Sequence, residues 1–68
     1  MSKLEPHVQR MADEQGELED RLEKLSAFIE SNPVFKTLSE TDQSLLLAQS
    51  TAMATYSNIL NLRIKLAQ

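Results

Sequence analysis

Apolar residues in the first half of the chain recur with the seven-residue spacing of a coiled-coil seam. Because Pro6 suits the first turn of a helix, the pattern predicts a helix from Pro6 to about Ser31. Gln15 is the polar member of the seam, and such residues can set the register between helices. The two rows of the seam, offset by four residues, are Leu4, Met11, Leu18 and Leu25, and Val8, Gln15, Leu22 and Ile29.

A cluster of helix-breaking residues, SNPVFKTLSETD, follows this helix. Asn32 suits a helix end and Pro33 opposes its continuation, whereas Ser39 suits the N-cap of a new helix. The sequence therefore predicts a loop over 32–38 and a second helix from Glu40 to about Ala67. A loop this short makes the two helices antiparallel neighbours, so we expect residues 1–68 to form one helical-hairpin domain.

The second predicted helix carries apolar residues around more of its circumference than one partner helix can cover. Together with the small size of the chain and its lack of cysteine, this predicts an all-α antiparallel two-helix hairpin that assembles into a homo-oligomeric helical bundle. Two apolar rows and one mixed row, each with a spacing of seven, are Leu46, Met53, Leu60 and Ala67; Leu45, Ala52, Ile59 and Leu66; and Gln49, Tyr56 and Arg63.

The charge of the chain is divided unevenly between its two parts. All ten acidic residues precede position 43, whereas residues 43–68 contain Arg63, Lys65 and many small or neutral polar side chains. A solvent-facing helix is usually rich in Glu and Lys, and neutral polar groups are cheaper to bury than charges. The second helix is therefore predicted to form a subunit interface around a polar cavity; the alternative is an ordinary surface that has drifted to Ser and Thr.

Composition also excludes several classes of function. The net charge of −3 disfavours duplex nucleic acid as a partner. No apolar run is long enough for a membrane span, and we expect a cytoplasmic location because the N-terminus lacks the apolar core of a signal peptide. With one histidine, one glycine, no cysteine and no spaced ligand pattern, we expect neither an enzyme nor a metal or cofactor site.

The row Gln49, Tyr56 and Arg63 suggests a ligand. An aromatic ring can stack on a base, an amide can recognise its edge and a guanidinium can pair with phosphate. Met53 would add apolar contact, and Arg21 and Lys24 of the first helix would assist from another subunit, at the level of residues 43–50. The simpler interpretation is a core tyrosine whose hydroxyl reaches a partner, with Arg63 extending to solvent at the helix end.

The segment ELEDRLEKLSAFIESNPVFKTLSETDQSLLLAQSTAMATYSNILNLRI resembles a family of very small helical-hairpin proteins of crAss-like and other tailed phages. The resemblance covers about residues 17–64. The second predicted helix of this chain has fewer charges than the family pattern. Its recurring elements are Arg21-Leu22, Lys24-Leu25, Phe28-Ile29, Pro33, Phe35, Leu38, Leu45-Leu46, Gln49, Ala52-Met53, Tyr56, Leu60 and Arg63-Ile64.

Small oligomeric phage proteins of this size and architecture include sponges that trap the cyclic nucleotide signals of bacterial immunity, as anti-CBASS and anti-Thoeris proteins do. The resemblance therefore implies a homo-oligomer in the host cytoplasm that binds a cyclic oligonucleotide or ADP-ribose-type signal without cleaving it. It assigns no binding residue; those above are chosen by their chemistry. The alternatives are a protein-interaction module that inhibits or scaffolds a host or phage protein and, after it, a structural accessory such as a virion component.

Overall fold

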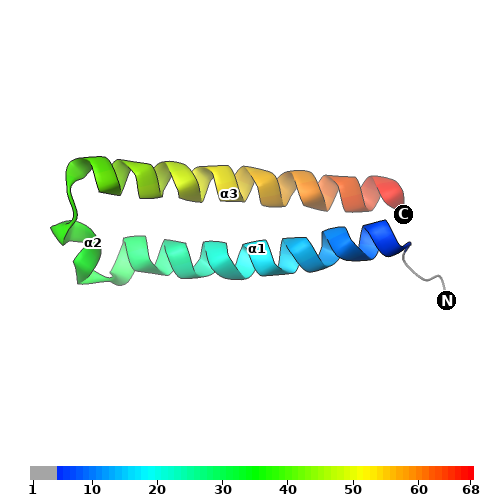
Figure 1. Ribbon diagram of the computed structural model, residues 1–68, viewed down its shortest axis with the longest axis horizontal. Helices are drawn as coiled ribbons and strands as arrows, with labels where there is room; N and C mark the ends of the chain where they lie inside the picture. The colour runs from blue at the N-terminus through cyan, green and yellow to red at the C-terminus, as the bar shows by residue number, and fades with distance from the viewer. Residues whose placement is uncertain (1–4) are drawn as a thin grey trace.

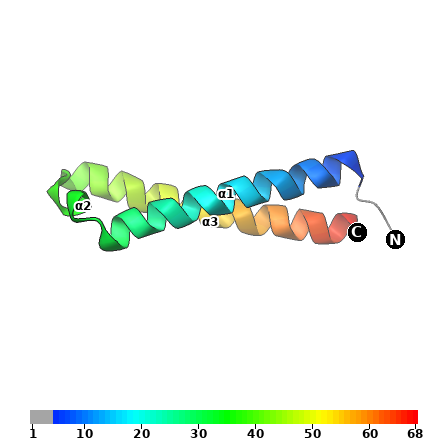
Figure 2. The ribbon, with the colours of Figure 1, turned by 90° about the horizontal axis from the view of Figure 1, so that it is seen from below.

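The computed structural model describes residues 5–68, and every regular element in that range is a helix: α1 (Pro6–Ser31), α2 (Pro33–Thr37) and α3 (Glu40–Ala67). The all-α class predicted from the sequence is confirmed. The two long helices lie side by side and antiparallel, joined by α2 (Figure 1), and cross at a shallow angle (Figure 2). The described residues form a rod of 51 × 16 × 14 Å.

The face of α1 that packs on α3 is the two-row seam expected from the sequence. Val8 and Met11 are buried near the open end of the rod. The other seam positions within the described range are partly buried, whereas Leu4 lies outside the described residues. Acidic side chains cover the outward surface of α1, so its only extensive apolar face is already used within the chain.

The face of α3 toward α1 differs from the one that leucine spacing suggests. Leu60 is fully buried against Val8 and Met11, and Ser57 is 5% exposed. The row that contains Leu46, Met53 and Leu60 alternates not with another apolar row but with a largely polar one. These two rows, all of whose members are buried or partly buried, are Gln43, Leu46, Ser50, Met53, Ser57, Leu60 and Ile64; Ala54 and Asn61 beside them are also partly buried.

The adjacent apolar row of α3 therefore points away from α1, together with a neighbouring row of small and apolar residues. Leu45, Ile59, Leu62 and Leu66 are 63%, 48%, 57% and 87% exposed. Each row has a spacing of seven, and the members of the two rows together follow one another at alternating spacings of three and four, as in a second helix-packing seam. We call this surface the outer strip; its members, all exposed, are Leu45, Ala48, Ala52, Thr55, Ile59, Leu62 and Leu66.

A polar layer crosses the middle of the α1–α3 seam. Gln15 donates from Nε2 to the backbone oxygen of Ser57 at 3.1 Å. The Ser57 hydroxyl in turn donates to a carboxylate oxygen of Glu19, also at 3.1 Å. Because a shift along the seam would break both hydrogen bonds, this layer favours one register of α1 against α3.

The segment 32–38, expected to be a loop, contains the helix α2. The Asn32 side chain caps it by accepting from the backbone N–H of Val34 at 2.9 Å, and Pro33 occupies its first turn. Phe35 is 8% exposed and packs edge-on against Phe28, with ring centroids 6.1 Å apart. The same Asn-Pro pair that ends α1 thus begins another helical turn, a role that the loop prediction overlooked.

Candidate functional site

The hydrogen bonds of Ser57 fix which residues of α1 and α3 lie at the same level. Since Ser57 bonds to both Gln15 and Glu19, it lies about opposite the residue midway between them. In an antiparallel pair, four residues further along α1 corresponds to four residues back along α3. Arg21 is then level with about Met53, outside the expected range 43–50, and Lys24 is level with about Ser50, at its edge.

The rod has two long flanks, which can be told apart by the residues around Ser57. A shallow depression of about 350 Å³ on one flank is lined by both helices: Glu19, Leu22, Glu23, Ala54, Ser57 and Asn58. Heptad geometry places Arg21 on the opposite flank of α1, and it places Gln49 and Tyr56 on that same opposite flank of α3. Arg21 lies at a level between those two residues. Arg63 belongs to the same heptad row as Gln49 and Tyr56, so the fold brings four of the six predicted ligand residues to one flank.

The row Gln49, Tyr56 and Arg63 lies outside the α1–α3 seam, directly beside the outer strip. All three side chains are exposed, and Tyr56 is 42% exposed. Met53 is different because it is partly buried in the seam, where its sulfur contacts Gln49 Nε2 at 3.9 Å. Within one chain, Tyr56 is therefore not a core residue, and its ring remains open to a partner or ligand.

The charged side chains on and near this flank differ in whether a charge of opposite sign lies within ion-pair distance. Lys24 pairs with Asp20 at 3.1 Å, and both side chains are largely exposed, so that pair contributes little to stability. Among residues 5–68, Arg21 has no carboxylate within the 4 Å of an ion pair. Glu14 lies on the same flank one heptad before Arg21, so an acid separates Arg21 from Arg63 of the same chain. An anion is therefore best placed at the Arg21–Gln49 end.

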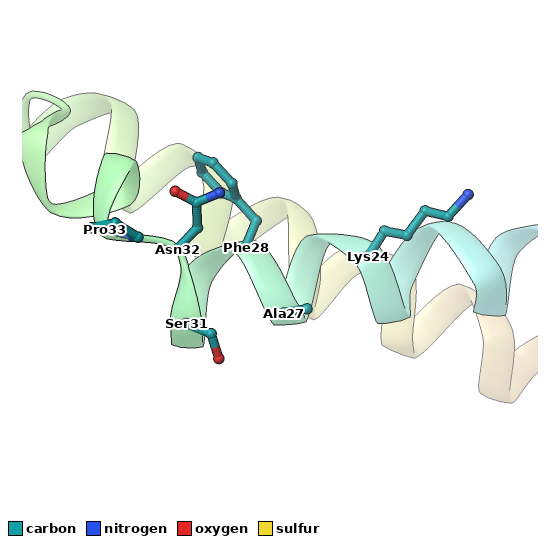
Figure 3. Close-up of a pocket in the computed structure, with 6 residues that line it drawn as sticks. All are labelled: Lys24, Ala27, Phe28, Ser31, Asn32 and Pro33. Carbon is teal, nitrogen blue, oxygen red and sulfur yellow. The ribbon is translucent and has the colours of Figure 1, made fainter.

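A second depression, of about 550 Å³, lies at the turn end of α1 and contains no acidic side chain. In Figure 3 the Lys24 side chain extends away from Phe28, and the hollow is open to solvent. Sequence reasoning did not select Phe28 as a site residue, although it follows Arg21 by seven positions and therefore shares its flank. The residues that line this depression are Lys24, Ala27, Phe28, Ser31, Asn32 and Pro33.

The described range contains neither a metal-binding cluster nor a membrane-spanning helix. Residues 5–68 contain no group of three or more His, Asp or Glu side chains placed to hold a metal ion. No helix in that range is both long enough and apolar enough to cross a bilayer. The exposed Gln49–Tyr56–Arg63 row with the nearby Arg21 is thus the arrangement with the clearest binding chemistry.

Fold and surface together define a very small all-helical protein, with an antiparallel helix pair and an exposed apolar face on its second long helix. The family model described as Sequestin matches residues 5–66. The chain therefore belongs to the Sequestin family. No curated protein and no solved structure matches the chain.

Proposed function

We propose that this protein is a phage anti-defence protein that sequesters a cyclic nucleotide signal of bacterial immunity without cleaving it. It acts as a homo-oligomer in the cytoplasm of the host cell. The name of the family to which the chain belongs, Sequestin, supports a role in sequestration. The ligand class and the phage setting rest on the sequence resemblance and on the chemistry of the exposed flank.

One observation carries the choice of ligand: an exposed aromatic ring lies between an exposed amide and a guanidinium on one helix row. Tyr56 stacks on a base, Gln49 recognises a base edge and Arg63 pairs with phosphate, while Met53 supplies apolar contact beneath them. Arg21 assists from α1 of the same chain, on the flank that it shares with Gln49 and Tyr56, and Lys24 assists from α1 of another subunit. Because two to four cations are engaged, affinity falls with salt, though less steeply than for duplex DNA.

The direct experiment is isothermal titration of the wild-type protein with a panel of cyclic dinucleotides and cyclic ADP-ribose compounds. We expect at least one tight ligand, recovered chemically intact after the protein is denatured. Tyr56→Ala removes the stacking surface, and base stacking contributes about 1–3 kcal/mol, so the affinity should fall about 5- to 150-fold. Tyr56→Phe keeps the ring and should retain most of the affinity.

The chain offers a matched control for the phosphate contact. Arg63 and Lys65 are both exposed cations near the end of α3, but they lie on different flanks of the rod. Arg63→Gln should weaken binding, whereas Lys65→Gln removes the same formal charge and should have little effect. Equal losses in the two variants would indicate a nonspecific charge effect, and silence of the wild type across the whole panel would refute the proposal.

A protein-interaction module that inhibits or scaffolds a host or phage protein is the second candidate, and the exposed outer strip favours it. The two candidates differ in what the purified protein retains. A sponge recovers no stoichiometric protein from host lysate and protects a nucleotide signal from its receptor. An interaction module recovers one protein at a fixed ratio, and Ile59→Glu in the outer strip should abolish that recovery.

A further inference from the structure

The outer strip is an apolar surface that no other part of the described chain covers. Its large members are 48–87% exposed, and it contains no charged residue along about 32 Å of helix, from Leu45 to Leu66. The hydroxyl of Thr55, its most polar member, donates to the backbone oxygen of Thr51 at 3.1 Å, so it needs no further partner when buried. An exposed apolar surface of this kind is typical of a protein–protein contact.

We propose that the outer strip packs against the outer strip of a second copy, with the two α3 helices antiparallel around a two-fold axis near Thr55. The strip runs from Leu45 to Leu66, so its midpoint falls beside Thr55. Reversing the strip about that point sets leucine against leucine at both ends. It also sets the small Ala52 near the larger Ile59, the alternation of sizes that lets two helices approach and interdigitate.

The distribution of charge favours a second copy of α3 as the partner of the strip, and it favours the antiparallel direction. The outward surface of α1 is acidic, so it would bury carboxylates against the strip, whereas α3 brings no acid to the contact after Asp42. A parallel pair would place the two Arg63 guanidinium groups side by side. The antiparallel pair separates them by about 22 Å along the helices and also opposes the two helix dipoles.

The antiparallel arrangement also completes the ligand site, and in this respect it rests on the proposed function. A two-fold axis perpendicular to the pair keeps the Gln49–Tyr56–Arg63 row of both copies on the same side of the interface. Arg63 of the second copy then reaches the level of Gln49 and Arg21 in the first. Each dimer therefore has two equivalent sites, each with cations from both copies, free of the acid that separates Arg21 from Arg63 within one chain.

The self-association is tested without any nucleotide, by sedimentation velocity across micromolar protein concentrations. We expect wild type to sediment as a dimer or larger, above the 7.7 kDa of one chain. Ile59→Glu should weaken association about 100-fold or more because it buries an unpaired charge. Leu47 is the matched control: it is 49% exposed against 48% for Ile59 but lies off the strip, so Leu47→Glu should leave association unchanged.

A charge-pair experiment tests the direction of packing. In the antiparallel pair, residue 52 of one copy lies near residue 59 of the other, so Ala52→Lys combined with Ile59→Glu places opposite charges together twice. This double variant should associate more strongly than Ile59→Glu alone. In a parallel pair, position 52 meets position 52 and position 59 meets position 59, so the double variant would be weaker still.

Different results would refute the strip contact and the nucleotide sponge. A monomeric wild type, equal effects of Ile59→Glu and Leu47→Glu, or a double variant that associates no better than Ile59→Glu would each overturn the antiparallel strip contact. A wild type that dimerises through the strip but ignores the whole nucleotide panel supports this contact and refutes the sponge. The substituted side chains are exposed in the single chain, so each variant should keep its helices. Circular dichroism of each variant checks this.

Discussion

Truncation of Leu60 should be among the most damaging single substitutions in the chain. Leu60 has no exposed surface, and it packs against Val8 and Met11 with Leu18 and Ile64 around them. Leu60→Ala removes three carbon atoms, which corresponds to about 2.4 kcal/mol of transfer free energy at about 0.8 kcal/mol per buried CH₂. The cavity left behind adds to this loss, so we expect a cost of about 3 kcal/mol, within the usual range of about 2–5.

That loss is large relative to what a chain of this size can supply. At about 0.05–0.15 kcal/mol per residue, 68 residues give a total stability of about 3–10 kcal/mol. For a domain of this length each kcal/mol moves the Tm by about 4–8 °C, so the variant should melt about 12–24 °C below wild type. Far-ultraviolet circular dichroism during heating measures the shift, at several protein concentrations because the proposed association would raise the Tm by mass action.

Leu47→Ala is the control because Leu47 lies on the same helix but is 49% exposed. An exposed substitution of this kind should cost less than about 1 kcal/mol. If Leu60→Ala and Leu47→Ala destabilised the protein equally, or if Leu60→Ala cost less than about 1 kcal/mol, the packing of α3 on α1 would be in the wrong rotation and the assignment of the outer strip would fail with it.

Two further stability predictions concern the helices themselves. Gly16→Ala should stabilise the protein by about 1 kcal/mol, measured as a higher urea midpoint, because a Cβ at that position would meet nothing within 4 Å and alanine is the better helix former; a lower midpoint would contradict the open surroundings of Gly16. Ser39→Ala should cost about 1 kcal/mol, since the Ser39 hydroxyl accepts from the backbone N–H of Asp42 at 3.1 Å and caps α3. A thermal melt measures this loss as a lower Tm. Ser39→Asp, whose carboxylate can still cap α3, should keep the wild-type Tm.

The packing of α1 could be predicted from the sequence because two signals agree there. The apolar rows of α1 are narrow, and acidic residues fill the remaining surface, so only one rotation of the helix buries the apolar side. The N-cap at Ser39 was predictable for a similar reason, since a serine followed by acidic residues suits a helix start better than a helix interior.

The rotation of α3 could not be predicted in the same way. Leucines lie on both sides of this helix, so spacing alone does not say which side meets α1. In the structure the side with Ser57 and Gln43 faces α1. On that side Gln15 of α1 donates to the backbone oxygen of Ser57, and Gln43 donates to the backbone oxygen of Leu38 at 3.0 Å. The exposure of Gln49, Tyr56 and Arg63 follows from that choice, and heptad spacing without a register could not have revealed that Arg21 shares their flank.

The rotation of α3 also links folding to the proposed association. By turning its polar row toward α1, the chain places serines in a seam that could have held leucines, and it leaves the stronger apolar surface, the outer strip, facing outward. The α1–α3 seam alone is therefore weaker than the composition of α3 allows, and the proposed contact with a second copy would add the hydrophobic stabilisation of the strip. The absence of acids from residues 43–68 fits the proposed dimer, in which α3 would be the one element of the described chain with a covered surface on two sides.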